Sequence, residues 1–435
     1  MAGGDTTAVR KRFWEGDLLD FSGERVQVVV NPLLRVGAGN GWFENTRGAR
    51  FEALIDSAWE VSGALEERQG IGGPLLSEWA RATANLQLQT VVLPGWGRAK
   101  WTNPSTDTTL PIAFDASRAT VHIGHSGHWG RLATHFESGL DHRHEGTAEH
   151  SLFWSRTAAP VPFVGGSLTG ARWHAAGWIG SATGPDRGPS GATAESLFSR
   201  QRVTRLGAGL HKGDAWSTDF LYYRLARLPF TNEPPATRHW AGVQASLFHG
   251  PWHAYLALAI NPAARQTNAP AYLGEHLHLR WQNDRTAIAL AYQRTLPGGY
   301  RALPTQIDLT HAGTPIATPW GDGLTTTSLR ASHQPVRTWK GLSFDVHVAH
   351  VSGDMNPDMF IRENTWHDSP KWVTNAFLTL PLQAAWPMAL KAGVQLVTWH
   401  AAANTQDRRP PAATWCVGLS HKFKHHTAHF ASEIP

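Results

Sequence analysis

The chain has 435 residues with a formal net charge of +5, and 41% of them are hydrophobic. Its single cysteine, Cys416, excludes an intrachain disulfide framework, and no apolar run approaches the roughly 18 residues of a membrane-spanning helix. The charge is spread without a run of about five like charges, so a nucleic-acid groove is not expected. The remaining classes are a soluble all-β protein and a membrane barrel, whose strands need only alternate.

The N-terminal segment, residues 1–25, is polar and has no apolar stretch of the kind that signal peptides contain. We therefore expect no signal peptide in this sequence, although export to an outer membrane requires one. The first strand is predicted over 26–36, and Asp56-Ser57 is predicted as the turn of the next hairpin.

Residues 70–115 differ from their surroundings. Pro74 stands at a plausible helix start, and 75–86 has helical composition. The turn-rich segment Leu93-Pro-Gly-Trp-Gly97 and a Thr-rich loop follow. We interpret 70–115 as a small helical and loop insertion, either a plug inside a barrel or a periplasmic element.

Short alternating runs resume after the insertion and continue to Phe423. Short turns alternate with long loops, which is typical of outer-membrane barrels. We predict an all-β fold, a transmembrane antiparallel barrel of about 16 to 18 strands over 26–423, followed by a tail over 424–435. The predicted strands here are 118–124, 131–136, 171–180, 202–211, 216–226, four within 241–292, 324–332, 342–351, 372–382, 389–400 and 414–423.

The sharpest alternation lies within 241–292. Because successive side chains of a strand point to opposite faces, the row Leu277, Leu279 and Trp281 opposes the row His276, His278 and Arg280. A soluble sandwich would bury the apolar row in a core. In a membrane barrel that row contacts lipid while the polar row lines the lumen, and the 21 tryptophans suit the aromatic girdles of such a barrel.

Several short motifs occur in a fixed order along 26–423. They are Thr46-Arg47-Gly48, Pro94-Gly95-Trp96-Gly97, Phe114-Asp-Ala-Ser-Arg-Ala-Thr120, Phe136 with Gly139, Ser151 and Leu152 with Ser155, Tyr292 to Pro297, and His311-Ala-Gly-Thr-Pro-Ile-Ala-Thr-Pro-Trp-Gly321. This order resembles the Bacteroidetes outer-membrane barrels of the capsule-assembly (Wzi-type) and gliding-motility-like family. The resemblance implies a barrel of about 18 strands that handles surface polysaccharide without catalysis. The 139–155 loop departs from the family, because it is rich in His and Glu where the family has Gly, Arg and Asp.

The 24 histidines raise the question of metal binding and catalysis. The paired histidines are 142 with 144, 276 with 278, and 425 with 426. A structural zinc site takes four ligands, often with cysteine among them, so we expect no metal site and no cofactor. A polar lumen produces acid–histidine pairs by default, so we expect no enzyme. The lumen-facing candidates are Arg118, His122, His276, His278, Arg280, Asp345 and His347.

Carbohydrate binding uses aromatic faces beside planar polar groups, and the long loops carry both. We expect these groups to lie in exposed loops. The tryptophans there could equally belong to the aromatic girdle at the membrane interface. The candidate polysaccharide-binding residues are Arg143, Glu145, Ser151, Trp154, Ser155, His311, Trp320 and Asp322.

The sequence therefore predicts a non-enzymatic outer-membrane barrel that attaches or assembles capsule or exopolysaccharide at the cell surface. Its expected partners are outer-membrane lipid, lipopolysaccharide, surface polysaccharide and proteins of a surface complex. Two alternatives stay open. One is a passive porin or the barrel of a secretion or motility complex, and the other is a soluble all-β carbohydrate-binding protein.

Overall fold

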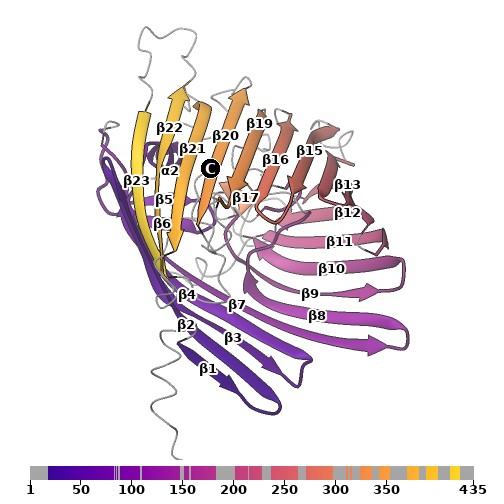
Figure 1. Cartoon of the computed structure of the whole chain (residues 1–435). Helices are drawn as coiled ribbons and strands as arrows, with labels where there is room; N and C mark the ends of the chain where they lie inside the picture. Colours follow the sequence, from indigo (N-terminus) through magenta and orange to yellow (C-terminus); the bar gives the residue numbers. More distant parts are fainter. Residues whose placement is uncertain are drawn as a thin grey trace, which may run out of the picture.

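A computed structural model gives the architecture of the chain (Figure 1). Eighteen antiparallel strands form a closed barrel, as predicted, and short elements lie inside it or at its edge. Within the described part of the chain, no helix has the length and apolarity to cross a membrane. The structure describes residues 18–82, 84, 86, 89–107, 110–146, 151–155, 158–182, 201–213, 215–227, 237–262, 271–296, 310–311, 314–315, 324–335, 342–352, 370–381, 388–399 and 412–421.

The barrel strands follow one another around the wall in chain order. They are β2 (Val26–Gly39), β3 (Trp42–Ile55), β4 (Trp59–Ile71), β7 (Ala113–Trp129), β8 (Leu132–Asp141), β9 (Val161–Thr169), β10 (Trp173–Ala182), β11 (Gln201–Lys212), β12 (Trp216–Arg227), β13 (Thr237–His249), β14 (Trp252–Ile260), β15 (Tyr272–Gln282), β16 (Thr286–Thr295), β19 (Thr325–His333), β20 (Ser343–Ser352), β21 (Pro370–Pro381), β22 (Met388–Trp399) and β23 (Ala412–His421).

Closure and turn lengths define the two ends of the barrel. β23 pairs with β2, so that Val36 lies opposite Leu419 and the eighteen barrel strands form a closed ring. One end carries short connections, such as Asp56 and Ser57, which take the left-handed φ values of 51° and 55° that the predicted tight turn requires. The other end carries most of the long connections, which in barrels of this kind face the cell exterior.

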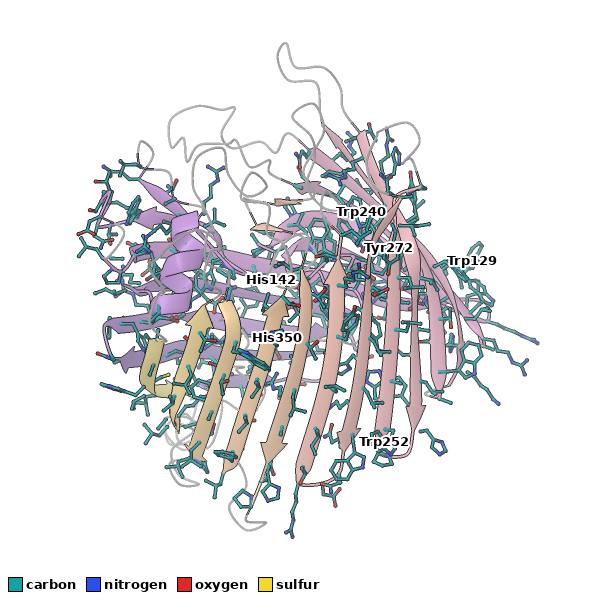
Figure 2. All side chains as sticks on the ribbon, turned by 90° about the horizontal axis from the view of Figure 1, so that it is seen from above. Trp129, His142, Trp240, Trp252, Tyr272 and His350 are labelled. Carbon is teal, nitrogen blue, oxygen red and sulfur yellow. The ribbon has the colours of Figure 1, made fainter. Side chains whose placement is uncertain are left out.

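The outer face of the wall is apolar, because strand alternation directs every second side chain outward. Leu277 of β15 is 53% exposed, whereas the neighbouring His276 is 2% exposed. An exposed apolar surface that runs around the wall suits contact with lipid. Exposed tryptophans gather beside the short turns, as in an interfacial girdle, and Figure 2 shows two of them at the edge of the barrel. They are Trp59, Trp129, Trp173, Trp216 and Trp252, whereas the exposed Trp372 and Trp415 lie toward the end with the long connections.

The predicted insertion folds against the inner wall and comprises α2 (Pro74–Ala82), β5 (Thr90–Leu93) and β6 (Gly97–Trp101). It buries Leu76, Leu93 and Trp96 together with Phe114 of β7, and Figure 1 shows these elements behind β21 to β23. The insertion leaves β4 at the end with the long connections. The choice between a plug and a periplasmic element stays a prediction.

Several predicted boundaries differ from the structure. A short strand, β1 (Leu19–Ser22), pairs with β2 inside the segment 1–25 that was predicted to be a polar extension. The first barrel strand extends to Gly39, because its pairing with β3 continues to Trp42. Phe423 and the predicted tail 424–435 lie outside the described residues.

Candidate functional site

The connection between β8 and β9 enters the barrel and contacts its inner wall. We call residues 142–160 the strap, of which 142–146, 151–155 and 158–160 are described. Phe153 and Trp154 are fully buried against wall aromatics. Phe153 stacks on Tyr223 with centroids 6.3 Å apart, and Trp154 meets Trp178 edge to face at 5.4 Å. The strap is therefore packed like a protein core rather than like a solvated loop.

Glycine makes this close packing possible at two positions. Gly146 has a φ of +90°, and a Cβ there would lie 2.4 Å from the Tyr255 hydroxyl oxygen. Gly242 of β13 stands beneath the Phe153 ring, where a Cβ would come within 2.8 Å. A side chain at either position would push the strap away from the wall.

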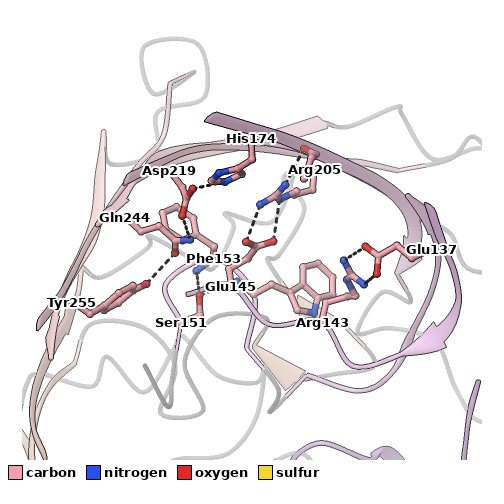
Figure 3. Close-up of polar contacts among 12 residues, drawn as sticks. Glu137, Arg143, Glu145, Ser151, Phe153, His174, Arg205, Asp219, Gln244 and Tyr255 are labelled. Atoms are coloured by element: carbon pink, nitrogen blue, oxygen red, sulfur yellow. Dashed lines mark hydrogen bonds and ion pairs between the residues drawn. The ribbon is translucent and has the colours of Figure 1, made fainter. Parts of the chain in front are cut away.

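Two ion pairs hold the strap to the wall (Figure 3). Arg143 donates to both carboxylate oxygens of Glu137 on β8, at 2.8 and 2.7 Å. Glu145 accepts two hydrogen bonds of 3.0 Å from Arg205 of β11. Both pairs are bidentate and shielded from solvent, which makes them stronger and more directional than surface pairs.

The strap also fixes its own shape. The Ser151 hydroxyl oxygen accepts hydrogen bonds from the backbone N–H groups of Phe153 (3.0 Å) and Trp154 (3.3 Å). The backbone N–H of Glu145 donates to the carbonyl of Trp154 at 2.9 Å. The ion-paired arm and the aromatic arm are thus joined into one unit.

A polar row continues along the wall beside the strap (Figure 3). The Tyr255 hydroxyl donates to Gln244 at 3.1 Å, and Gln244 donates to Asp219 at 3.0 Å. Asp219 lies 2.7 Å from Nε2 of His174. The row presents donors and acceptors to the interior, which suits polar ligands or water.

Arg118 of β7 connects the insertion with the strap. Its guanidinium pairs with Glu66 of β4, donates to the carbonyl of Gly95 at 3.0 Å and lies 4.2 Å above the Trp96 ring. It also lies 3.0 Å from Nε2 of His142, whose Nδ1 donates to the Ala158 carbonyl. Because Nδ1 carries the proton, Nε2 accepts from Arg118. Two motifs that are distant in sequence, around residues 96 and 118, thus meet in space.

The expected binding residues are placed differently from the prediction. Ser151, Trp154 and Ser155 are fully buried, and Arg143 and Glu145 are occupied by ion pairs with the wall. These five residues were expected in an exposed loop, but apolar neighbours in the strap draw its described residues inward. His311 lies in the short β17 (Thr310–His311), which pairs with β18 (Thr314–Pro315), and its side chain is not described. Trp320 and Asp322 lie outside the described residues.

The expected lumen residues alternate along their strands with exposed apolar side chains, and they therefore lie on the opposite face of the wall. His276 and His278 are buried between outward Leu277 and Leu279. Arg280 continues their row but is exposed near the end of β15. Arg118, His122, Asp345 and His347 are half-buried on the same kind of inward row.

Other contributors to this interior were missed from the sequence. Glu137, Arg205, Asp219 and Gln244 stand on four different strands, and only the register of the wall brings them together. The sequence does predict that each of them faces inward, since each alternates with an outward apolar residue. Alternation does not identify which residues on other strands they contact. Within the described residues, one group could hold a metal ion, and it consists of Glu60, His122 and His135.

Comparison with known proteins supports the fold. Neither the scan of family models nor the search of curated proteins found a match. Among solved structures, the chain is similar to Wzi of Escherichia coli, a carbohydrate-binding barrel of the outer membrane involved in group 1 capsule assembly, with a TM-score of 0.56, 9% identity, and coverage of 95% of this chain and 86% of that chain.

Weaker likenesses extend to porins. A BenF-like porin of Pseudomonas fluorescens has a TM-score of 0.47 at 11% identity, and OpdK of Pseudomonas aeruginosa has 0.46 at 9%; each comparison covers 92% of this chain and 99% of the other. The likeness to Wzi, at 9% identity, shows the fold alone, which is that of an outer-membrane barrel. The Bacteroidetes affiliation stays a prediction, since these neighbours come from other bacteria.

Proposed function

We propose that this protein is a non-enzymatic barrel of the bacterial outer membrane that attaches or assembles capsule or exopolysaccharide at the cell surface. The observation that carries the proposal is the strap, whose buried aromatics and two bidentate ion pairs fill part of the lumen. A lumen that is partly filled in this way suits a protein that binds at the cell surface better than an open diffusion channel. The fold likeness to a carbohydrate-binding barrel supports the same direction.

The outer surface and the net charge support the proposed location in a membrane and the proposed polysaccharide partner. The apolar outward rows and the exposed tryptophans suit a lipid bilayer with lipopolysaccharide in its outer leaflet. The net charge of +5 favours an acidic polysaccharide over a neutral one. Proteins of a surface complex complete the proposed partners.

Two measurements on the detergent-purified full chain test this proposal. Alginate, an acidic polysaccharide, is expected to bind in a salt-sensitive manner, whereas dextran of similar mass is not. In planar bilayers the protein is expected to give no steady conductance. Steady conductance without alginate binding would establish the passive porin instead, and extraction from cells without detergent would establish the soluble carbohydrate-binding protein.

The absence of catalysis is tested separately. One serine–histidine pair has hydrogen-bond geometry, because Ser126 Oγ lies 3.0 Å from His135 Nδ1. Hydrolysis of p-nitrophenyl butyrate is expected to equal the rate of a Ser126→Ala variant. A rate that falls on this substitution would show a barrel-resident hydrolase.

A further inference from the structure

Three side chains converge on the inner wall around Gly124. Glu60 of β4, His122 of β7 and His135 of β8 each offer one ligand atom, and these atoms lie within 4.8 Å of one another. Their strands are adjacent in the wall, in the order β4, β7 and β8. The group therefore joins three neighbouring strands at one point.

The register explains how these side chains reach one another. Gly124 pairs directly with Glu60 on one side and with Glu137 on the other. His122 is the inward residue just before Gly124 on β7. His135 is the inward residue next to Glu137 on β8, on the side of the β7–β8 turn. With no side chain at position 124, the space between the two imidazoles stays open.

The Glu60 carboxylate occupies that space. A Cβ at Gly124 would lie 2.5 Å from Oε1 of Glu60, closer than real contacts allow. The carboxylate thus lies directly over the glycine, and one of its oxygens is within 4.8 Å of a ring nitrogen of each histidine. Any larger residue at position 124 would displace it.

Both imidazoles have neighbours that orient them. Ser126 Oγ lies 3.0 Å from Nδ1 of His135, which leaves Nε2 of that ring for another partner. Oε2 of Glu137 lies 3.5 Å from Nε2 of His122, and Glu137 is itself held by Arg143 of the strap. Hydroxyl and carboxylate groups in these positions are the usual outer partners of metal-binding histidines.

We propose that Glu60, His122 and His135 bind a divalent transition-metal ion, and that Zn²⁺ is the ion this set suits. Two imidazole nitrogens and one carboxylate oxygen are common zinc ligands, with a fourth position left for water. Mg²⁺ and Ca²⁺ prefer sites made of oxygen alone. Bound zinc ties β4 to the β7–β8 hairpin beside the Glu137–Arg143 pair that holds the strap.

Zinc titration of the tag-free full chain in detergent, followed by calorimetry, tests the proposal, with MgCl₂ as the comparison ion. One Zn²⁺ per chain is expected, and the double variant His122→Ala/His135→Ala is expected to lose that binding. His125→Ala is the matched control, because His125 is on the same strand but contacts Trp59 on the outer face. It is expected to bind zinc as the wild type does.

Two further variants keep the result interpretable if the double variant folds poorly. Glu60→Gln preserves size and removes the anionic ligand, and Ser126→Ala removes only the orienting hydroxyl, which is expected to weaken zinc binding by about 10- to 100-fold. Heat-shifted migration on gels reports whether each barrel is folded. Equal zinc affinity in the wild type and in folded Glu60→Gln and Ser126→Ala variants, or the absence of tight zinc binding, would overturn the proposal.

Discussion

The buried pair between Glu145 and Arg205 gives a quantitative test of how the strap is held. Both side chains are 11% exposed, and the two hydrogen bonds between them are 3.0 Å long. Glu145→Gln keeps the shape of the side chain but leaves the Arg205 charge without its carboxylate. Removal of one partner from a buried pair costs about 3 to 5 kcal/mol.

The lower end of that range applies here. Arg205 keeps its hydrogen bond of 2.9 Å to the Ala176 carbonyl, and glutamine can still accept one bond. A loss of about 3 kcal/mol raises the population of the undocked strap by about 160-fold. The buried aromatics Phe153 and Trp154 still favour docking, so the strap is expected to open more often rather than to leave the lumen.

Hydrogen exchange followed by mass spectrometry measures that opening directly, because a protected amide exchanges in proportion to its opening equilibrium. Peptides that contain the Glu145 amide are expected to exchange about 160-fold faster in Glu145→Gln, while peptides of β20 to β22 keep their rate. Glu67→Gln is the control, since its pair with Arg47 is exposed by 48% and 57% and contributes about 0 to 1 kcal/mol. Unchanged exchange in the strap would refute the role of this ion pair, and faster exchange everywhere would show a loss of the whole barrel.

Three further predictions concern the packing of the strap and the wall. Trp154→Ala is expected to weaken strap docking by about 3 to 5 kcal/mol, because it empties a buried site. Faster hydrogen exchange of the strap amides would show this loss, and unchanged protection would contradict it. Gly146→Ala combines an unfavourable φ with a clash against the Tyr255 hydroxyl, so strap protection should fall while Gly213→Ala, at an open turn, leaves it intact. Leu277→Arg is expected to destabilise insertion into phosphatidylcholine vesicles by up to about 2 to 4 kcal/mol in denaturant titrations, whereas a soluble fold would tolerate it.

The sequence by itself determined the class of the fold and the sidedness of its strands. Because side chains alternate along a strand, the order of residues alone assigns the rows through Leu277 and His276 to opposite faces. Turn residues such as Asp56 predict the position of a hairpin, because their backbone preferences depend on the local sequence alone. The count of about 16 to 18 strands follows from the same local pattern and agrees with the eighteen observed.

The tertiary structure decided everything that depends on which strands meet. The strap was predicted as an exposed loop because its charged residues are conspicuous in sequence, but Arg143 and Glu145 find partners on β8 and β11 only after the barrel closes. Their ion pairs remove the cost of burying charge, and Trp154 then supplies the favourable burial. The convergence of Glu60, His122 and His135 likewise depends on a register across three strands and on a glycine at position 124 that leaves room for the Glu60 carboxylate, which no local pattern encodes.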